Sequence, residues 1–263
     1  MKKRIIISIH VDGYYGLTNG VPRVLKLLKK YNLKANFFVS MGRESSILDI
    51  LKLRGISGKN KSRIKIQERY TFFQKICMLL LNRKIGSGHC KLLKEIEKEG
   101  HEVNPHCWSH LRWSKNFENL NIDNEFKKMC RAYFSCLNHF PTGFVPPLWK
   151  WDKRVLNSLE KNNFESLCVI SKEKKPYFNG KILLFPLSLD STPEELFSQG
   201  YSEREIIESY KKELKKNYVH FYFHADFEGI KGIEIFENIL NLIKNKRAYT
   251  CKEIYTEMNQ KRK

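Results

Sequence analysis

The sequence predicts an α/β fold with a mostly parallel sheet, because short apolar runs alternate along the chain with longer amphipathic ones. The apolar runs have the length of buried strands, and the amphipathic runs have helical periodicity. The expected strands are 4–9, 34–40, 101–105, 142–146, 165–170, 182–187 and 218–223. No internal repeat and no Pro- or Gly-rich linker divides the sequence, so we expect one domain over residues 1–263.

Helices are expected between these strands. The clearest begins near Pro22, because a proline in the first helical turn sacrifices no hydrogen bond. Its apolar residues recur with i, i+3, i+4 and i+7 spacing, at Val21, Val24, Leu25, Leu28 and Tyr31. Ser202 and Glu205 have the spacing of a capping box and predict another helix start. Further helices are expected near 90–99, 122–138, 151–162 and 231–245.

The composition is that of a globular protein, since 41% of the residues are hydrophobic and 13% are aromatic, which excludes a disordered chain. The basic first residues resemble the start of a signal peptide, but the apolar run at 5–9 is too short for one. The run at 76–81 falls far short of the roughly 20 residues that a membrane span needs. Seven scattered cysteines without a C-x-x-C pair exclude a zinc ribbon and favour a reduced, cytosolic setting.

The net charge is +20, and the basic residues are spread along the chain. One interpretation is a compositional bias toward lysine, and the other is attraction to a polyanion such as an anionic membrane leaflet or nucleic acid. The sequence contains no recognisable nucleic-acid-binding module, so we do not expect nucleic acid as a partner. The segment 58–83 mixes basic and apolar residues, a pattern typical of an interfacial helix on lipid and equally of a surface helix.

Four polar clusters stand where expected strands end, and they are listed here in chain order: His10–Gly13, His106–His110, Trp149–Trp151 and His224–Glu228. In barrels of parallel strands, the carboxyl ends of the strands build the active site. We therefore expect these four clusters to converge on one site, although they lie far apart in the sequence.

Two histidines and an aspartate from these clusters predict a metal site. His106 and His110 are spaced i, i+4, so they lie on one side of a helical turn and can bind one ion, although this spacing alone also fits two surface histidines. With Asp12 the set becomes two imidazoles and a carboxylate, which suits zinc, iron(II), cobalt or manganese and leaves positions for water and substrate. One divalent ion held there would polarise a carbonyl oxygen and activate water, as amide hydrolysis requires.

The same reaction needs an acid to protonate the departing amine. His224 follows the apolar run 218–223 and is the candidate acid, the alternative being a core histidine bonded to backbone. His10 lies two residues before Asp12, so on a strand both side chains face the same site.

Residues 10–16, 20–23, 35–42, 101–110 and 224–230 resemble the polysaccharide deacetylase superfamily, the NodB-homology group. Within that group the sequence is similar to the formamido-arabinose-phosphoundecaprenol deformylases. Gly-Val-Pro-Arg at 20–23 matches a family helix start, and His-Glu-Val at 101–103 begins a family pattern that ends in His-x-Trp-x-His. The stretch at 224–230 matches a family His-Ala-Glu-Val-Glu-Gly pattern.

The resemblance implies a distorted (β/α)7-type barrel of mostly parallel strands with helices outside. It also implies Asp12, His106 and His110 as metal ligands and His224 as the general acid. The implied substrate is a formylated amino sugar on a polyprenyl-phosphate carrier at the cytoplasmic membrane face, of the kind used in lipid A modification.

Two positions depart from the family pattern. His10 replaces the aspartate expected as general base, and a neutral imidazole can accept a proton near pH 7. Lys150 stands where a family Gly-Trp-Arg motif has arginine, so a point charge replaces a bidentate fork in a position expected to bind substrate. Trp108 and Trp149 would give flat faces to a sugar ring or lipid stem, and ordinary core packing is the alternative for both.

The resulting hypothesis is a metal-dependent hydrolase that removes a formyl or acetyl group from a lipid-linked amino sugar. His10 would act as base and His224 as acid, and Asp226 or Glu228 would orient His224, with Asp190 a weaker candidate for orienting a catalytic group. The expected location is the cytoplasm, peripheral on the inner face of the membrane. Two alternatives stay open: an N-deacetylase of another glycan, and a catalytically impaired relative that binds a lipid-linked sugar.

Overall fold

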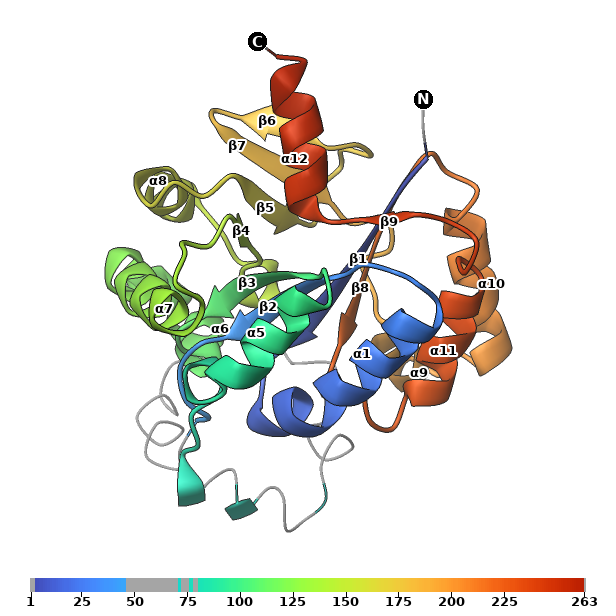
Figure 1. The fold of residues 1–263 in the computed structure, drawn as a ribbon, viewed down its shortest axis with the longest axis horizontal. Helices are drawn as coiled ribbons and strands as arrows, with labels where there is room; N and C mark the ends of the chain where they lie inside the picture. The colour runs from blue at the N-terminus through green and yellow to red at the C-terminus, as the bar shows by residue number, and fades with distance from the viewer. Residues whose placement is uncertain (1–2, 46–70, 72–75, 78–79, 263) are drawn as a thin grey trace.

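The strands form two sheets in a computed structural model of the chain, which describes residues 3–45, 71, 76–77 and 80–262 (Figure 1). The first sheet has the strand order β3-β2-β1-β8, and its parallel strands are β1 (Arg4–Val11), β2 (Asn36–Ser40), β3 (Glu102–Cys107) and β8 (Tyr218–His224). The short strand β9 (Ala248–Tyr249) pairs with the beginning of β1.

The second sheet has the order β4-β5-β7-β6. Its parallel strands are β4 (Gly143–Phe144), β5 (Ser166–Val169) and β7 (Ile182–Pro186), and the antiparallel edge strand is β6 (Tyr177–Asn179). All seven expected strands are therefore confirmed, whereas β6 and β9 were not expected.

Hydrogen bonds join the two sheets at two places. Between β3 and β4, the Asn104 side-chain oxygen accepts from the N–H groups of Thr142 at 3.1 Å and Gly143 at 2.8 Å. Between β7 and β8, the Ser188 N–H donates to the His220 carbonyl at 3.0 Å, and the His220 N–H donates to the Ser188 hydroxyl at 2.9 Å. The two linked sheets agree with the distorted, mostly parallel barrel that the family resemblance implies.

Side chains of β1 alternate between two cores, as the two-residue period of a strand requires. Its odd-numbered residues from 5 to 11 pack outward beneath the helices, whereas Ile6 belongs to an inner apolar cluster. At the amino-terminal end of the barrel this inner cluster is covered by α12 (Cys251–Gln260), whose Ile254 is fully buried. At the other end, the inward-facing position of β1 is held by the buried His10.

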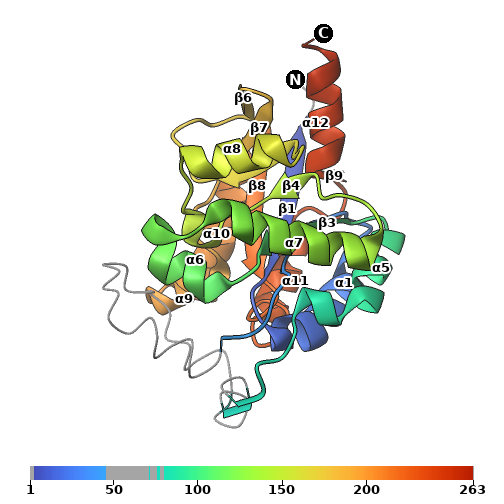
Figure 2. The same ribbon diagram turned by 90° about the vertical axis from the view of Figure 1, so that its left-hand side faces the viewer.

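The helices lie outside the strands, and Figure 2 shows α7 and α8 in front of them. Besides α12, the helices are α1 (Val21–Lys30), α5 (Cys90–Lys98), α6 (His110–Asn116), α7 (Ile122–Leu137), α8 (Lys153–Lys161), α9 (Pro193–Ser198), α10 (Glu203–Glu213) and α11 (Ile233–Asn241). Every helix expected from the sequence is confirmed, but α6, α9 and α12 were not expected.

Most of the segment 58–83, for which an interfacial helix was considered, lies outside the described residues. Within the described ranges, no helix combines the length and the apolar character needed to cross a bilayer.

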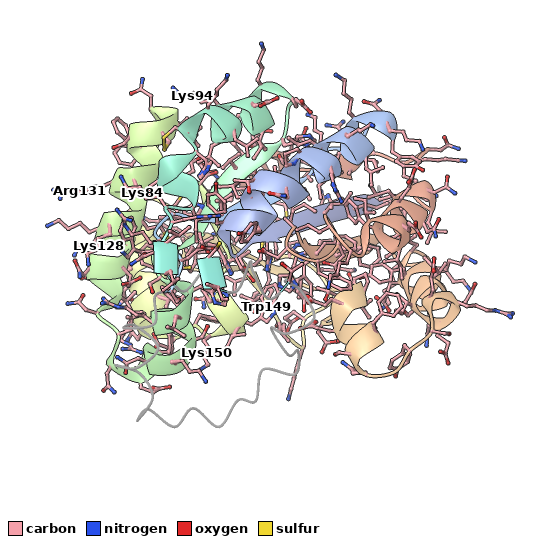
Figure 3. The ribbon with its side chains drawn as sticks, turned by 90° about the horizontal axis from the view of Figure 1, so that it is seen from below. Lys84, Lys94, Lys128, Arg131, Trp149 and Lys150 are labelled. Atoms are coloured by element: carbon pink, nitrogen blue, oxygen red, sulfur yellow. A yellow bond between two sulfur atoms is a disulfide. The ribbon has the colours of Figure 1, made fainter. Side chains whose placement is uncertain are left out.

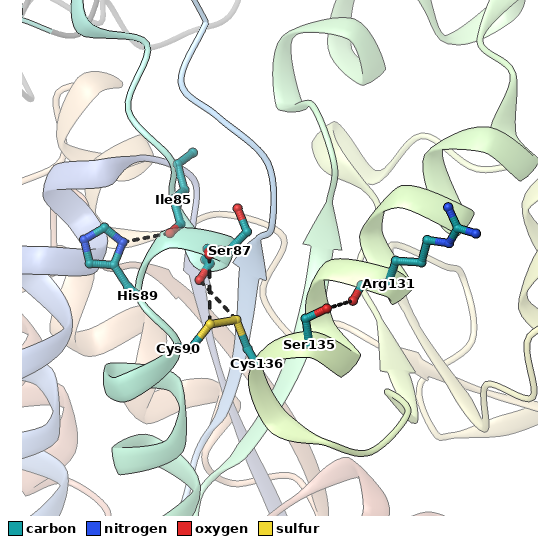
Figure 4. Close-up of a disulfide and its surroundings, with 8 residues drawn as sticks. Ile85, Ser87, His89, Cys90, Arg131, Ser135 and Cys136 are labelled. Carbon is teal, nitrogen blue, oxygen red and sulfur yellow. Dashed lines mark hydrogen bonds between the residues drawn. A yellow bond between two sulfur atoms is a disulfide. The ribbon is translucent and has the colours of Figure 1, made fainter.

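The structure corrects the expectation that the cysteines are reduced. Cys90, which begins α5, and Cys136, near the end of α7, form a disulfide (Figure 4). The expectation was wrong because the packing of α5 against α7 brings together two cysteines that are 46 residues apart, and no local spacing reveals such a pair. The remaining five cysteines are free.

Candidate active site

Asp12, His106 and His110 converge at the carboxyl ends of β1 and β3, as predicted. Asp12 follows β1, His106 lies near the end of β3, and His110 is the first residue of α6. The expectation that His106 and His110 lie on one side of a helical turn was wrong, because β3 extends to Cys107 and α6 begins only after the N-cap Ser109. The Asp12 Oδ1 atom lies 3.4 Å from His106 Nε2 and 3.9 Å from His110 Nε2. One donor atom from each residue falls within 4.8 Å of the others.

The surroundings of the two imidazoles prepare them to bind a metal ion. His106 Nδ1 lies 2.8 Å from the Val145 carbonyl oxygen, so it carries the proton there and leaves Nε2 as the acceptor directed at Asp12. Burial lowers the pKa of His106 to about 4, which keeps the ring neutral at neutral pH. His110 Nδ1 lies 3.3 Å from the Ser114 hydroxyl, again on the side away from Asp12. Two imidazoles and a carboxylate fit a divalent metal ion.

His10 shares the inner face with this triad. Its ring centroid lies 5.1 Å from that of His106 and 5.6 Å from that of His224, so it stands between the metal-binding and acid candidates. Burial, together with repulsion from His106 and His224, lowers the pKa of His10 well below its usual value. The buried Nε2 atom of His10 has no hydrogen-bond partner among the described residues. The His10 imidazole is therefore neutral at neutral pH, and its Nε2 atom is not engaged by another described group.

His224 ends β8 and faces the Oδ2 atom of Asp12, whereas His106 and His110 face its Oδ1 atom. Its Nε2 lies 3.9 Å from Asp12 Oδ2, and its Nδ1 lies 3.6 Å from Glu194 Oε2. Glu228 accepts a hydrogen bond from the His224 backbone N–H at 2.6 Å and another from the Glu194 N–H at 3.0 Å. Glu228 therefore holds the two backbones together, while the carboxylate that faces the imidazole belongs to Glu194.

Glu194 is the site residue that the sequence did not reveal. It lies in the first turn of α9 after the capping box of Thr192 and Glu195, and glutamates in that position are usually exposed. Its exposed fraction is only 3%. The expected alternative, Asp190, has an exposed side chain, and its carbonyl rather than its carboxylate makes the described hydrogen bond.

Asp226 holds the backbone of Asp12. It is fully buried, and its Oδ2 accepts a hydrogen bond from the Asp12 backbone N–H at 3.1 Å. This contact fixes the point at which the chain leaves β1 and so directs the Asp12 carboxylate. Asp226 was expected to orient His224, but the described contact places it on Asp12.

The two tryptophans occupy different environments. Trp149 follows Leu148, and both have positive φ values of 58° and 52°, which are strained for residues with side chains. This turn puts the Trp149 ring 5.3 Å from the His10 ring and 5.0 Å from the Tyr222 ring, inside the site. Trp108 is half-buried against the outer core, which matches the alternative of ordinary packing.

Lys150 lies beside Trp149 at the end of the barrel seen in Figure 3. Its ammonium donates to the Ser114 carbonyl at 2.8 Å, and its own carbonyl accepts from the Trp113 indole at 3.0 Å. Ser114 is in α6, so Lys150 fixes the helix that carries His110. A binding role for this ammonium toward substrate was expected, and its described partner is instead this backbone carbonyl.

The polysaccharide deacetylase family model matches residues 2–167. The Wigglesworthia glossinidia brevipalpis protein named "probable 4-deoxy-4-formamido-L-arabinose-phosphoundecaprenol deformylase ArnD" is 27% identical over 255 residues, covering 90% of this chain and 87% of that protein. The Listeria monocytogenes peptidoglycan-N-acetylglucosamine deacetylase PgdA is 26% identical over 213 residues, which cover 74% of this chain and 36% of that protein.

Two solved structures share the fold. A Mycobacterium smegmatis protein assigned to the polysaccharide deacetylases superimposes with a TM-score of 0.66 at 14% identity, covering 100% of this chain and 92% of that one. A Bacillus anthracis CE4 family pseudoenzyme superimposes with a TM-score of 0.57 at 15% identity, covering 97% of this chain and 66% of that one. The family match extends over more than half of the sequence, and the chain therefore belongs to the polysaccharide deacetylase family.

Proposed function

We propose that residues 1–263 act as one domain, a metal-dependent hydrolase that removes a formyl group from an amino sugar on a polyprenyl-phosphate carrier. The observation that carries this proposal is the grouping of Asp12, His106 and His110 within 4.8 Å of one another, with His10 and His224 beside them. The similarity to a protein named as a deformylase of that kind over 90% of the chain supports the formyl group and the carrier.

In this mechanism Asp12, His106 and His110 hold one divalent ion, which would polarise the amide carbonyl and lower the pKa of water. His10 accepts the proton that water loses as its oxygen attacks the carbonyl carbon. His224 donates a proton to the amine nitrogen as the C–N bond breaks, so that formate and a free amino sugar result. Glu194 faces His224 Nδ1 and stabilises the charged imidazolium.

Metal content tests the site before any substrate is made. Plasma mass spectrometry of the purified protein should find about one zinc, iron, cobalt or manganese per chain. His110→Ala should lose this ion. His139→Ala is the matched control, because His139 is an exposed histidine paired with Glu97 on the surface. A protein that holds no metal even after reconstitution would contradict the hydrolase mechanism.

Product analysis distinguishes formyl from acetyl removal. The protein should release formate from an N-formylated amino sugar faster than acetate from its N-acetylated counterpart. Release of acetate alone would favour the second candidate, an N-deacetylase of another glycan, which the similarity to PgdA supports. His224→Ala should abolish turnover and leave the metal content nearly unchanged. Binding of the sugar without release of either acid would favour the catalytically impaired relative, for which the replacement of the family aspartate by His10 is the argument.

We further propose that the protein acts at a membrane surface, where the net charge of +20 would favour an anionic leaflet. The relative's lipid-linked substrate supports the inner face of the cytoplasmic membrane. The Cys90–Cys136 disulfide favours an oxidising compartment instead. Cys77 is free and half-buried, so its labelling in intact cells by a thiol reagent that cannot cross the membrane distinguishes the two sides. Sedimentation with anionic vesicles tests the surface itself.

A further inference from the structure

Lys150 was the cation expected to face the substrate, and its ammonium is engaged elsewhere. Lys150 directs its ammonium to the Ser114 carbonyl, as described above. Another cation, the half-exposed Arg83, lies over the segment that follows β1. Arg4, Arg154 and Arg247 form ion pairs with carboxylates. Among the described residues, no carboxylate forms such an ion pair with Arg83.

Arg83 is held over Tyr14 and Tyr15, which are separated from Asp12 by one residue. Its guanidinium carbon lies 4.5 Å from the ring centroid of Tyr14 and 5.4 Å from that of Tyr15. Tyr14 is only two residues after Asp12, and its N–H donates to the buried Glu44 carboxylate at 3.1 Å. The segment that follows Asp12 therefore positions the guanidinium through its two tyrosine rings.

The backbone around Arg83 is fixed before any ligand arrives. The Arg83 carbonyl accepts from the Glu44 N–H at 2.9 Å, and the Ile85 N–H donates to the Gly42 carbonyl at 2.8 Å, which makes a short antiparallel bridge after β2. Five residues after Ile85, the disulfide of Cys90 ties the same segment to α7 (Figure 4). A guanidinium on such a support loses little freedom on binding, and its fork matches the oxygens of a phosphate.

We propose that Arg83, stacked on Tyr14 and Tyr15, binds the phosphate that links the amino sugar to its lipid carrier. This inference rests on the proposed function for the identity of the ligand. Arg83 would then be a specificity residue, since it binds a part of the substrate that does not react. The tyrosine rings orient the guanidinium and give an apolar face to the first carbons of the lipid stem.

The test uses two synthetic ligands and the full metal-loaded chain. One ligand is an N-formylated amino sugar joined to geraniol through phosphate, and the other is its geranyl glycoside without phosphate. Dissociation constants are measured by calorimetry with the His224→Ala variant as background, so that neither ligand is consumed, and turnover is measured with the unmodified protein. Arg83→Gln is compared with Arg247→Gln, because Arg247 also stacks on a tyrosine, at 4.5 Å from the Tyr249 centroid, but at the far end of β1.

Arg83→Gln should weaken binding of the phosphate-containing ligand about tenfold to a hundredfold, the cost of a charge-assisted hydrogen bond, and leave the neutral ligand unaffected. Arg247→Gln should change neither constant. Equal effects of Arg83→Gln on both ligands, or no effect, would overturn the phosphate subsite while turnover by the unmodified protein leaves the proposed function intact. Failure of the unmodified protein to hydrolyse either ligand would refute the proposed function, and the binding constants would still decide the subsite. Inorganic phosphate that binds as tightly as the conjugate would also overturn the assignment to substrate.

Discussion

Removal of the Cys90–Cys136 disulfide should destabilise the protein strongly. The two cysteines are 46 residues apart in the sequence. In the chain-entropy description, a cross-link that closes a loop of that length in the unfolded chain stabilises the folded protein by about 4 kcal/mol. This is a large part of the roughly 5–15 kcal/mol that stabilises a typical folded protein. The substitution Cys90→Ala with Cys136→Ala removes the cross-link and little buried volume.

Urea unfolding followed by circular dichroism measures this effect. The double variant should unfold at a clearly lower urea concentration, and the unmodified protein should fall to the same midpoint after reduction with dithiothreitol. Cys77→Ala is the control, because Cys77 is free and should leave the midpoint unchanged. Equal midpoints for the unmodified protein with and without reductant would refute the reasoning, as would seven reactive thiols in the unfolded, unreduced protein.

Three further predictions concern histidines and the carboxylate beside one of them. Glu194→Gln should lower kcat by tenfold or more without loss of metal, since it removes the charge that faces His224 at 3.6 Å; an unchanged kcat would exclude this role. His10→Ala should reduce turnover at least about a hundredfold, as expected for loss of a general base, and His10→Asp should retain more activity than His10→Ala. Burial lowers the pKa of His101 to about 4, below its unfolded value near 6.5, and its Nδ1 accepts from the Ala35 N–H. The unfolded chain therefore takes up the proton first, so stability should fall by up to about 3 kcal/mol as pH drops from 6.5 to 4. His101→Asn keeps an acceptor for Ala35 and should flatten this pH dependence, and identical slopes for both proteins would contradict it.

The parallel strands could be predicted because they follow local rules, and the polar residues at their carboxyl ends could be expected to converge for the same reason. The i, i+4 spacing of His106 and His110 was misleading, because one lies in a strand and the other begins a helix. Strands such as β8 are apolar runs of strand length, and the period of two along β1 was enough to put His10 and Asp12 on one face. The same reasoning missed β6 and β9, which have only three and two residues and carry too little pattern to be recognised. It also missed α6, whose seven residues are too few to show helical periodicity.

The parts of the site that could not be predicted depend on packing between distant segments. Glu194 reaches His224 only because Glu228 holds the start of α9 against the end of β8. The role of Lys150 depends on α6 lying beside the loop after β4, which brings the Ser114 carbonyl to its ammonium. In each case the residue type was visible in the sequence, but its partner was not.

The close approach of Gly16 to Asp226 limits which sequences this site can accept. A Cβ atom at position 16 would overlap the Asp226 carboxylate, whose Oδ2 accepts the Asp12 N–H. Alanine, the smallest replacement, would push that carboxylate away from the backbone that aims the metal-binding aspartate. In a library of single substitutions selected for activity, position 16 should therefore tolerate glycine alone, although Gly16 is not one of the residues assigned to the metal or to proton transfer.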